Sequence, residues 1–516
     1  MGSSDDDGSS PKSLSTTPAS PDIAKPRASS PSIQKRPLDS DGSASELSSK
    51  KSRPAASIRY LDSSVRLMTV QRAPASHNVN CVSLESLLGD PDLELMVQIN
   101  YMIEVDFVMD RVHESVRDGL KTIVYHGLRY TQDQLRVENT FFFCISWTHH
   151  TKAMILFFRD GTMQLVVHTA NMIERDWRNK TQAAFLTARL PKKSQPSGLA
   201  ACAFERDLIE YLRRYAQHEE ITGRISQYDF TGVKGVLIGS VPGKFTGSER
   251  NKWGHLKLRA VLRQQVEIPR ESVQSSRVVC QISSIGSLGK SSQDWLRGEF
   301  ETSLNAHRHS NYMASGNADL CVVFPTADNV RTSLEGWTMG GSLPFQSTSY
   351  AKQAHYLNPL LHSWRAIKSG RERAMPHIKA RCLLLANLSK PAWGELKDST
   401  FTIKSYELGV LIFPGLYEDQ ADSGENLHVC MMNATMADPY PEPQIARSDM
   451  DAGSKKQRGL ADGDDWGGYS DAIGVVPIRL PYDLPLTKYN FEMGDQVWLS
   501  DKFFPGQDDY GETLEH

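Results

Sequence analysis

The sequence predicts an α/β protein with two similar halves, each a layered α-β-α unit with a mixed sheet. Short apolar runs typical of buried strands alternate with amphipathic stretches typical of helices. This alternation occurs twice, before and after about residue 245, and each series contains one His-x-Lys triplet followed by an asparagine. With 516 residues, 39% of them hydrophobic, the chain can form more than one core. We therefore expect an active site on a pseudo-two-fold axis between the halves.

The first series of elements begins near Ile58. The apolar stretch 84–112 is predicted to be helical around Gly89. Strands are predicted over residues 122–127, 141–147, 153–158, 163–171 and 235–241. The RDGT turn at 159–162 joins two of these strands into a hairpin, and an amphipathic helix is predicted over 206–217.

The second series repeats this order. Helices are predicted over 253–265 and 291–304, and strands over 278–286, 320–325 and 401–414. In both series a His-x-Lys triplet and an asparagine follow the strands. The two halves are therefore assigned to residues 58–245 and 246–516.

Two segments are predicted to be disordered because they offer few large apolar side chains to bury. The first is residues 1–57, rich in Ser, Pro, Asp and Lys; the second is an insertion of Gly, Asp and Pro at about 418–470. Order is expected to return over 475–485. The first segment contains the basic clusters Lys35, Arg36, Lys50, Lys51 and Arg53. These fit either a bipartite nuclear-import signal or a solvated charged tail; the first interpretation predicts a nuclear protein.

The cysteines and the distribution of apolar residues indicate in which part of the cell the protein is expected. The seven cysteines are scattered without a CxxC pair, which is typical of reduced thiols in an intracellular protein. No apolar signal core and no run of 18 apolar residues is found, so no membrane association is expected. The net charge of −3 says little about partners.

The two triplets carry the chemistry. Side chains two apart on a strand face the same way, which selects His150 rather than His149 to act together with Lys152. The predicted catalytic groups are His150, Lys152 and Asn171 in the first half and His377, Lys379 and Asn387 in the second. A third triplet, at 255–257, lies in a helical stretch, where residues i and i+2 do not share a face, and is interpreted as structural.

These residue types suit phosphoryl transfer. A neutral imidazole is a nucleophile toward phosphorus, while lysine and asparagine stabilise charge on the phosphate oxygens. The opposite histidine can protonate the leaving oxygen and then deprotonate water, a role that contributes on the order of 100- to 10,000-fold in rate. The sequence has no HExxH, DxD array or EF-hand loop, so we expect neither a metal nor another cofactor.

Longer stretches resemble the phospholipase D superfamily and, within it, the tyrosyl-DNA phosphodiesterases of type 1. They include THHTKAMI, VVHTANMIERDWRNKTQ, LIGSVPGKFTGSERNKWGH, SSIGSLG, AMPHIK, ANLSKPAWG and KSYELGVLIFP, spread over roughly residues 80–485. The signature of the tyrosyl-DNA phosphodiesterases carries asparagine where the lipid-cleaving members of the superfamily carry aspartate, and both copies here have asparagine. This feature and the lack of a membrane-binding segment argue against a lipid-acting enzyme.

The resemblance implies a DNA-repair phosphodiesterase. Its substrate would be single- or double-stranded DNA whose 3′ phosphate carries an adduct, above all a topoisomerase I-derived peptide joined through tyrosine. His150 would form a phosphohistidine, His377 would act as acid and then base, and the protein would act as a monomer. Gln182 and Glu407 match residues that support the two histidines. A neutral Gln182 beside His150 would leave that imidazole uncharged, and Glu407 would favour a protonated His377.

The resemblance also places DNA-backbone contacts at Ser284, Ser287 and Lys390. Four residues before His150, where the family has an aromatic residue, this chain has Ser146, and Trp147 follows it. Trp147 is predicted to belong to the core rather than to stack on DNA. Lys152 and Asn171 are nineteen positions apart, but Lys379 and Asn387 only eight, which is too short for the hairpin expected there. We therefore predict that His377, Lys379 and Asn387 cannot all reach one phosphate. The alternative function is a catalytically impaired protein that binds DNA ends.

Overall fold

The computed structural model describes residues 58–128, 138–195, 200, 202–268, 276–309, 319–377, 388–420, 426–432 and 473–514. All of them belong to one compact unit that begins at Ala55. Residues 1–57 and most of the predicted insertion lie outside the described residues. No helix within the described ranges is long and apolar enough to cross a bilayer.

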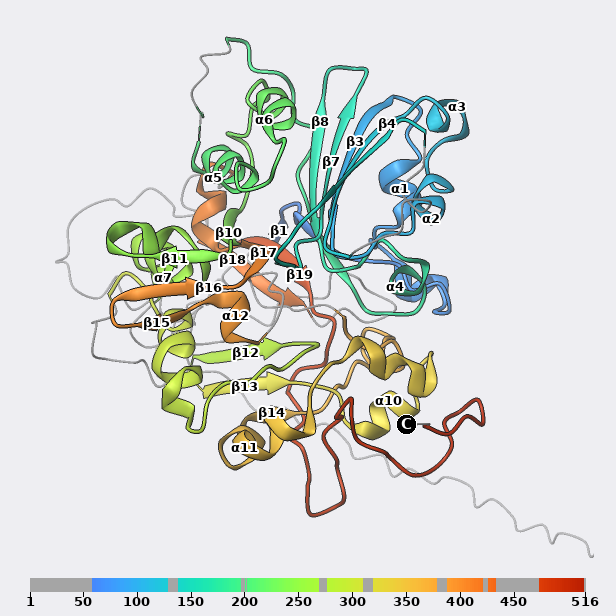
Figure 1. Cartoon of the computed structure of the whole chain (residues 1–516), viewed down its shortest axis with the longest axis vertical. Helices are drawn as coiled ribbons and strands as arrows, with labels where there is room; N and C mark the ends of the chain where they lie inside the picture. The colour runs from blue at the N-terminus through green and yellow to red at the C-terminus, as the bar shows by residue number, and fades with distance from the viewer. Residues whose placement is uncertain are drawn as a thin grey trace, which may run out of the picture. The chain divides into compact units, whose positions relative to one another are not determined.

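The largest element is a mixed seven-stranded sheet with the order β2-β9-β8-β7-β3-β4-β5 (Figure 1). Its strands are β2 (Val65–Leu67), β3 (Leu93–Asn100), β4 (Lys121–His126), β5 (Thr140–Cys144), β7 (Ala153–Phe158), β8 (Met163–His168) and β9 (Ala183–Leu186). Strands β3, β4 and β5 run parallel, and the other neighbours are antiparallel. The predicted hairpin of β7 and β8 is confirmed, with Ile155 opposite Leu165.

The prediction of a helix across 84–112 is wrong in its middle. The structure has short helices α1 (Leu84–Leu88), α2 (Val105–Met109) and α3 (Glu114–Arg117), but β3 lies between α1 and α2. Strand β3 is central and seven of its eight residues are buried. A strand buried on both faces has no alternation of apolar and polar residues, so its sequence resembles a buried helix.

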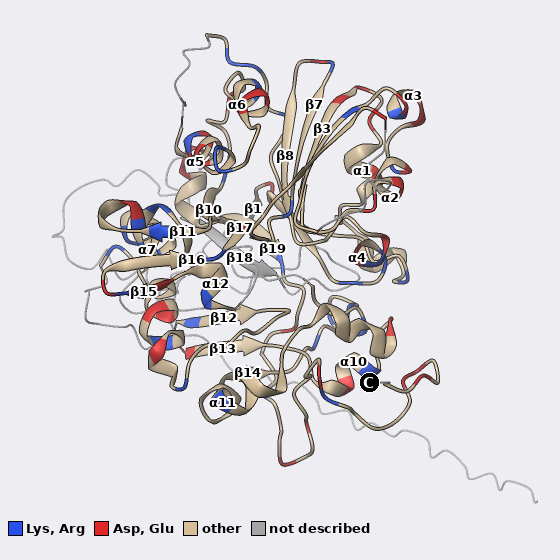
Figure 2. Ribbon diagram, in the orientation of Figure 1, with Lys and Arg blue, Asp and Glu red and all other residues tan. Residues whose placement is uncertain are grey.

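Helices cover both faces of this sheet, which gives the first half its α-β-α layers (Figure 1). On β3, Leu95, Val97 and Ile99 face the side covered by α5 (Ala203–Leu212) and α6 (Glu219–Ile225). Met96 faces the other side, with α1, α2 and α3. Strands β7 and β8 are drawn almost entirely in tan in Figure 2, because their sequences AMILFF and MQLVVH contain no Lys, Arg, Asp or Glu.

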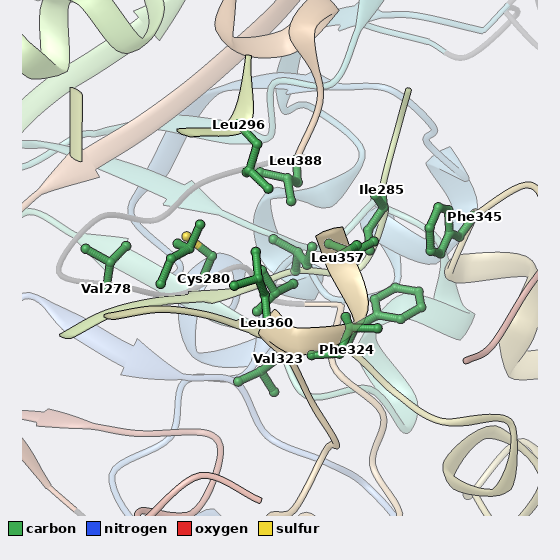
Figure 3. Packing of buried hydrophobic residues seen from close by; sticks show 14 of the residues in the cluster. Val278, Cys280, Ile285, Leu296, Val323, Phe324, Phe345, Leu357, Leu360 and Leu388 are labelled. Atoms are coloured by element: carbon green, nitrogen blue, oxygen red, sulfur yellow. The ribbon is translucent and has the colours of Figure 1, made fainter. Parts of the chain in front are cut away.

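A second core surrounds three parallel strands, β12 (Arg277–Gln281), β13 (Asp319–Val323) and β14 (Leu361–His362). Figure 3 shows side chains of this core, among them Val278, Val323, Phe324 and Leu360. Helices α7 (Gly254–Gln265), α11 (Ser347–Leu357) and α12 (Lys390–Trp393) contribute to it. The helix predicted over 291–304 is broken into a short 3₁₀ turn, a π-helical turn (Leu296–Glu301) and α9 (Thr302–Leu304).

Strands from both sides of residue 245 pair with each other. β17 (Ser405–Leu411) lies between β10 (Val236–Ser240) and β6 (Thr148–His149). β11 (Gly243–Phe245) pairs with β16 (Thr400–Ile403), which also pairs with β15 (Glu395–Lys397). The boundary at 245 stays a prediction, but chain segments far apart in sequence clearly share sheets.

The start of the predicted disordered insertion is ordered. A 3₁₀ helix covers Pro414–Gln420, and β18 (Asn426–Met432) pairs in parallel with β19 (Ile473–Arg479). β19 also pairs with β1 (Ile58–Tyr60). The run NLHVCMM has five apolar residues among seven, unlike the Gly-, Asp- and Pro-rich sequence that follows it. The prediction that disorder begins at about 418 is therefore wrong for the end of the 3₁₀ helix, residues 418–420, and for β18.

The packing of β7 predicts a large stability effect at its centre. Ile155 is fully buried, so Ile155→Ala should lower the free energy of unfolding by about 2–5 kcal/mol through lost burial and a cavity. Urea unfolding would measure this. Ile367 is 56% exposed, so Ile367→Ala should change the same quantity by less than about 0.5 kcal/mol. Equal losses in both variants would contradict the described core.

Candidate functional site

The first triplet directly follows β6 and directly precedes β7. Parallel pairing places Tyr406 of β17 opposite His149, and the backbone N–H of His150 donates to the Tyr406 carbonyl at 2.9 Å. Glu407 is the next residue along β17, with 0% of its side chain exposed. A strand from the second half of the sequence therefore fixes the backbone of the first triplet.

The alternation of side chains around this triplet agrees with the choice of His150. His149 is fully buried, and its Nε2 lies 3.0 Å from the Tyr215 hydroxyl. Thr151 points to the same side, where its Oγ1 is 2.5 Å from the Tyr211 hydroxyl. His150 is half-buried and its ring lies against Tyr101, with 5.4 Å between the centroids.

The side chain of Lys152 folds back onto the backbone of its own triplet. Its Nζ donates to the His150 carbonyl at 3.1 Å. Burial lowers the pKa of Lys152, and the carboxylates of Glu407 and Asp176 partly offset this effect. Both acids are thus close enough to interact with the lysine charge, although they come from different parts of the chain.

Asn171 is held by Asp176. Its backbone N–H and its Nδ2 donate to Oδ2 of Asp176 at 2.8 and 2.9 Å. The Trp177 indole N–H donates to the Asn171 carbonyl at 3.0 Å. Asp176 and Trp177 belong to helix α4 (Glu174–Arg178), so this short helix fixes the asparagine. The Oδ1 of Asn171 is buried and has no hydrogen-bond partner within the described ranges.

His377 reaches the site from the second half. Its backbone N–H donates to the Thr181 carbonyl at 3.0 Å, next to a parallel bridge between Thr181 and Pro376. On the ring, Nδ1 is 3.0 Å from Nε2 of Gln182 and 3.4 Å from Oδ2 of Asp176. The structure therefore places His377 against the segment that follows Asn171.

The predicted partners of the histidines need a correction. Gln182 binds His377 and not His150, because Gln182 follows the residue that is bridged to Pro376. Glu407 lies instead on the strand that pairs beside His149 and binds the backbone of His150. The structure places the carboxylate of Asp176 next to His377, and the predicted pairing of Gln182 with His150 is wrong.

Asp176 is the site residue that the sequence analysis missed. It is buried, and its Oδ1 accepts from Lys180 Nζ at 2.5 Å. Burial alone would raise the pKa of Asp176, but the charges of His377 and Lys180 and its hydrogen bonds hold it well below its usual range. The sequence does contain one signal for this ion pair: Asp176 and Lys180 are four residues apart at the end of a helix, a spacing that lets opposite charges meet.

The remaining predicted residues divide into two groups. Lys379 and Asn387 lie outside the described residues, so their spacing argument stays a prediction. Ser284, Ser287 and Lys390 are on neighbouring segments: Gly286 N–H donates to Leu388 O at 3.0 Å and Leu388 N–H to Ser284 O at 3.2 Å. Lys390 pairs with Glu395 at 2.7 Å.

Two interpretations of single residues can also be checked. Trp147 is 58% exposed, so its assignment to the core is wrong. It follows the end of β5 by three residues and precedes β6, outside the sheet that would bury it. The structural interpretation of the third triplet is confirmed: His255 is fully buried, with Nδ1 2.8 Å from the Ser303 hydroxyl.

Comparison with known proteins settles the family. The family model described as tyrosyl-DNA phosphodiesterase matches residues 64–490. The chain belongs to the tyrosyl-DNA phosphodiesterase family. This assignment confirms the resemblance stated from the sequence and, with it, the class of enzyme, a phosphodiesterase.

Relatives and solved structures agree with this family. Tyrosyl-DNA phosphodiesterase 1 of Arabidopsis thaliana is 32% identical over 88% of this chain and 76% of its own length. A probable tyrosyl-DNA phosphodiesterase of Schizosaccharomyces pombe is 28% identical over 86% of this chain and 94% of its own. The crystal structure of the yeast tyrosyl-DNA phosphodiesterase covers 85% of this chain and 99% of its own, with a TM-score of 0.59 and 17% identity. This last match confirms the predicted phospholipase D-like α/β fold.

The contact between Asp176 and His377 predicts a change in the pH dependence of phosphodiester hydrolysis. Asp176→Asn removes a negative charge beside His377, which disfavours the protonated imidazole. We expect kcat to fall about tenfold or more and the limb of the pH–rate profile that reports His377 to move to lower pH by about one unit. Glu174→Gln, exposed on the same helix, is the control and should leave both unchanged. An unaltered profile in Asp176→Asn would exclude this role.

Buried His149 predicts acid sensitivity of folding. Burial, reinforced by the charge of Lys152, lowers the pKa of His149 from 6.5 to about 3. Between these values the unfolded chain binds the extra proton, so the free energy of unfolding must fall as pH falls from 6.5 toward 3. His149→Gln should reduce the slope of the free energy of unfolding against pH by about 1.4 kcal/mol per pH unit in this range.

Denaturant unfolding at several pH values would measure that slope. His355 is exposed on α11, so His355→Gln should keep the slope of the unsubstituted protein. The same slope in the two variants would show that His149 does not titrate in this way.

Proposed function

We propose that this protein hydrolyses the bond between a tyrosine and the 3′ phosphate of DNA, as the names of its relatives suggest for them. The proposal rests on the position of the His377 ring, whose Nδ1 lies next to Asp176 and Gln182. These groups lie in one network with Asn171 and Lys152. The network joins residues more than two hundred positions apart and connects the two triplets.

The first chemical step would be attack on phosphorus by an imidazole nitrogen of His150. The bond between phosphorus and the tyrosyl oxygen breaks as a phosphorus–nitrogen bond forms, leaving DNA joined to the protein as a phosphohistidine. The leaving oxygen takes a proton from His377. Asp176 and Gln182 both contact Nδ1, so we assign this proton to Nε2.

The second step would be hydrolysis of the phosphohistidine. His377, now neutral, takes a proton from water, the oxygen attacks phosphorus, and the phosphorus–nitrogen bond breaks. The products are a DNA 3′ phosphate and a regenerated His150. Lys152 supplies positive charge for the phosphate oxygens in both steps, and Lys379 and Asn387 are proposed to complete that set.

The segments around Ser284, Ser287 and Lys390 are proposed to contact the DNA backbone. Two backbone hydrogen bonds hold these segments side by side, which supports a common surface. Charged and hydroxyl side chains of this kind contact phosphates without reading bases. We propose a topoisomerase I-derived peptide as the adduct, and a nuclear location from the basic clusters at Lys35 and Lys50.

Cleavage of a 3′-phosphotyrosyl oligonucleotide in EDTA tests the function. We expect a product ending in a 3′ phosphate, no cleavage by His150→Ala, and a covalent protein–DNA species that accumulates in His377→Asn. His355→Ala serves as the control because His355 is exposed on α11. The spacing of Lys379 and Asn387 favours the alternative, a protein that binds DNA ends. Binding of the oligonucleotide without cleavage would support that alternative and refute the proposed hydrolysis.

A further inference from the structure

Outside the active site, one cysteine lies between two arginines. The Sγ of Cys81 is 3.1 Å from Nη2 of Arg371 and 3.5 Å from Nη1 of Arg479. Cys81 itself is half-buried. Arg371 belongs to the segment before His377, and Arg479 is the last residue of β19.

The charges of the two arginines are poorly compensated. Arg371 is 1% exposed, and its Nε and Nη1 have no hydrogen-bond partner in the described part of the chain. The Nε of Arg479 is likewise without a partner there. Neither guanidinium pairs with a carboxylate of a described residue: their bonds go to the Cys81 sulfur and to carbonyls of Met68, His77, Val79 and Ser369.

Such an arrangement favours an anion at the sulfur. A buried cation without a counter-charge is costly, and a guanidinium offers several N–H donors in a fork that matches two oxygens on one atom. Burial lowers the pKa of Arg371 to about 10, and Cys81 raises it while Arg479 lowers it further. The structure thus supplies two unpartnered N–H groups on a buried arginine that already touches the sulfur.

We propose that Cys81 is a modification site at which hydrogen peroxide oxidises the sulfur and Arg371 and Arg479 bind the oxygens that are added. In the first step a sulfur electron pair attacks one peroxide oxygen and the O–O bond breaks. The departing hydroxide takes the thiol proton as water, which leaves a sulfenic acid. A second peroxide converts it in the same way to a sulfinic acid, whose two oxygens and negative charge suit two guanidiniums.

Two other cysteines provide matched comparisons. Cys202 is also half-buried, but its Sγ contacts the Phe230 carbonyl at 3.5 Å and no arginine in the described residues. Cys144 is exposed. If access alone decided oxidation, Cys144 would react first; if the arginines decide it, Cys81 would.

The test is oxidation of the full chain by hydrogen peroxide, with dimedone trapping of sulfenic acid and peptide mass spectrometry to follow each cysteine. We expect Cys81 to react about tenfold faster than Cys202 and faster than Cys144, since cationic neighbours accelerate thiol chemistry. Arg479→Gln should bring the rate of Cys81 down severalfold, while Arg479→Lys, which keeps the charge, should retain more of it.

The result that overturns the proposal is a Cys81 rate equal to or below that of Cys202, or one that Arg479→Gln leaves unchanged. Circular dichroism of the variants checks their folding. If Arg479→Gln does not fold, the comparison of Cys81 with Cys202 in the unsubstituted protein decides the question alone. Neither measurement depends on phosphodiesterase activity.

Discussion

The buried carboxylate of Asp176 is the interaction on which the candidate site depends. Its oxygens bind Lys180 Nζ, the backbone and side chain of Asn171 and, at 3.4 Å, the ring of His377. A buried carboxylate is stable only where partners satisfy its charge and its lone pairs. The need to satisfy Asp176 therefore fixes the positions of the two groups that would handle the phosphate and the proton.

The same site also depends on long-range strand pairing. β17 pairs with β6 on one edge and with β10 on the other, which places a strand of the second half next to the first triplet. The bridge between Thr181 and Pro376 works in the opposite direction, bringing the second triplet's histidine to the first half. His150 and His377 are therefore each held by a segment that lies far away in the sequence.

Much of this could be predicted from the sequence. The strands β7, β8, β10 and β13 are short apolar runs typical of buried strands, and the helices α5 and α7 are amphipathic, so their sequences predict them. The choice of His150 over His149 followed from strand alternation. β3 was mistaken for helix because burial on both faces removes the alternation that identifies a strand. β18 was missed because its seven residues lie beside a long low-complexity stretch, and its partners in β19 are 47 positions further along the chain.

The partners of the histidines could not be predicted in the same way. Motif order along the chain does not determine which strand edge lies beside which loop, so Gln182 was assigned to His150, although it binds His377. The spacing of Asp176 and Lys180 was a weak signal, because acidic residues in the first turn of a helix are common for electrostatic reasons unrelated to a site. The structure distinguishes Asp176 from the exposed Glu174 by its burial and by its contacts with Asn171, Lys180 and His377.

The pairing of Asp176 with Lys180 explains how one carboxylate can serve a histidine in two charge states. In the proposed reaction, His377 is protonated before the first step and neutral before the second. A lone buried carboxylate beside a neutral imidazole would tend to take up a proton itself, since burial raises its pKa. Lys180, fully buried and bonded to the other carboxylate oxygen, lowers the pKa of Asp176 independently of His377. Asp176 can therefore stay ionised when His377 has given up its proton, and it can still hold the ring in place for the return of that proton.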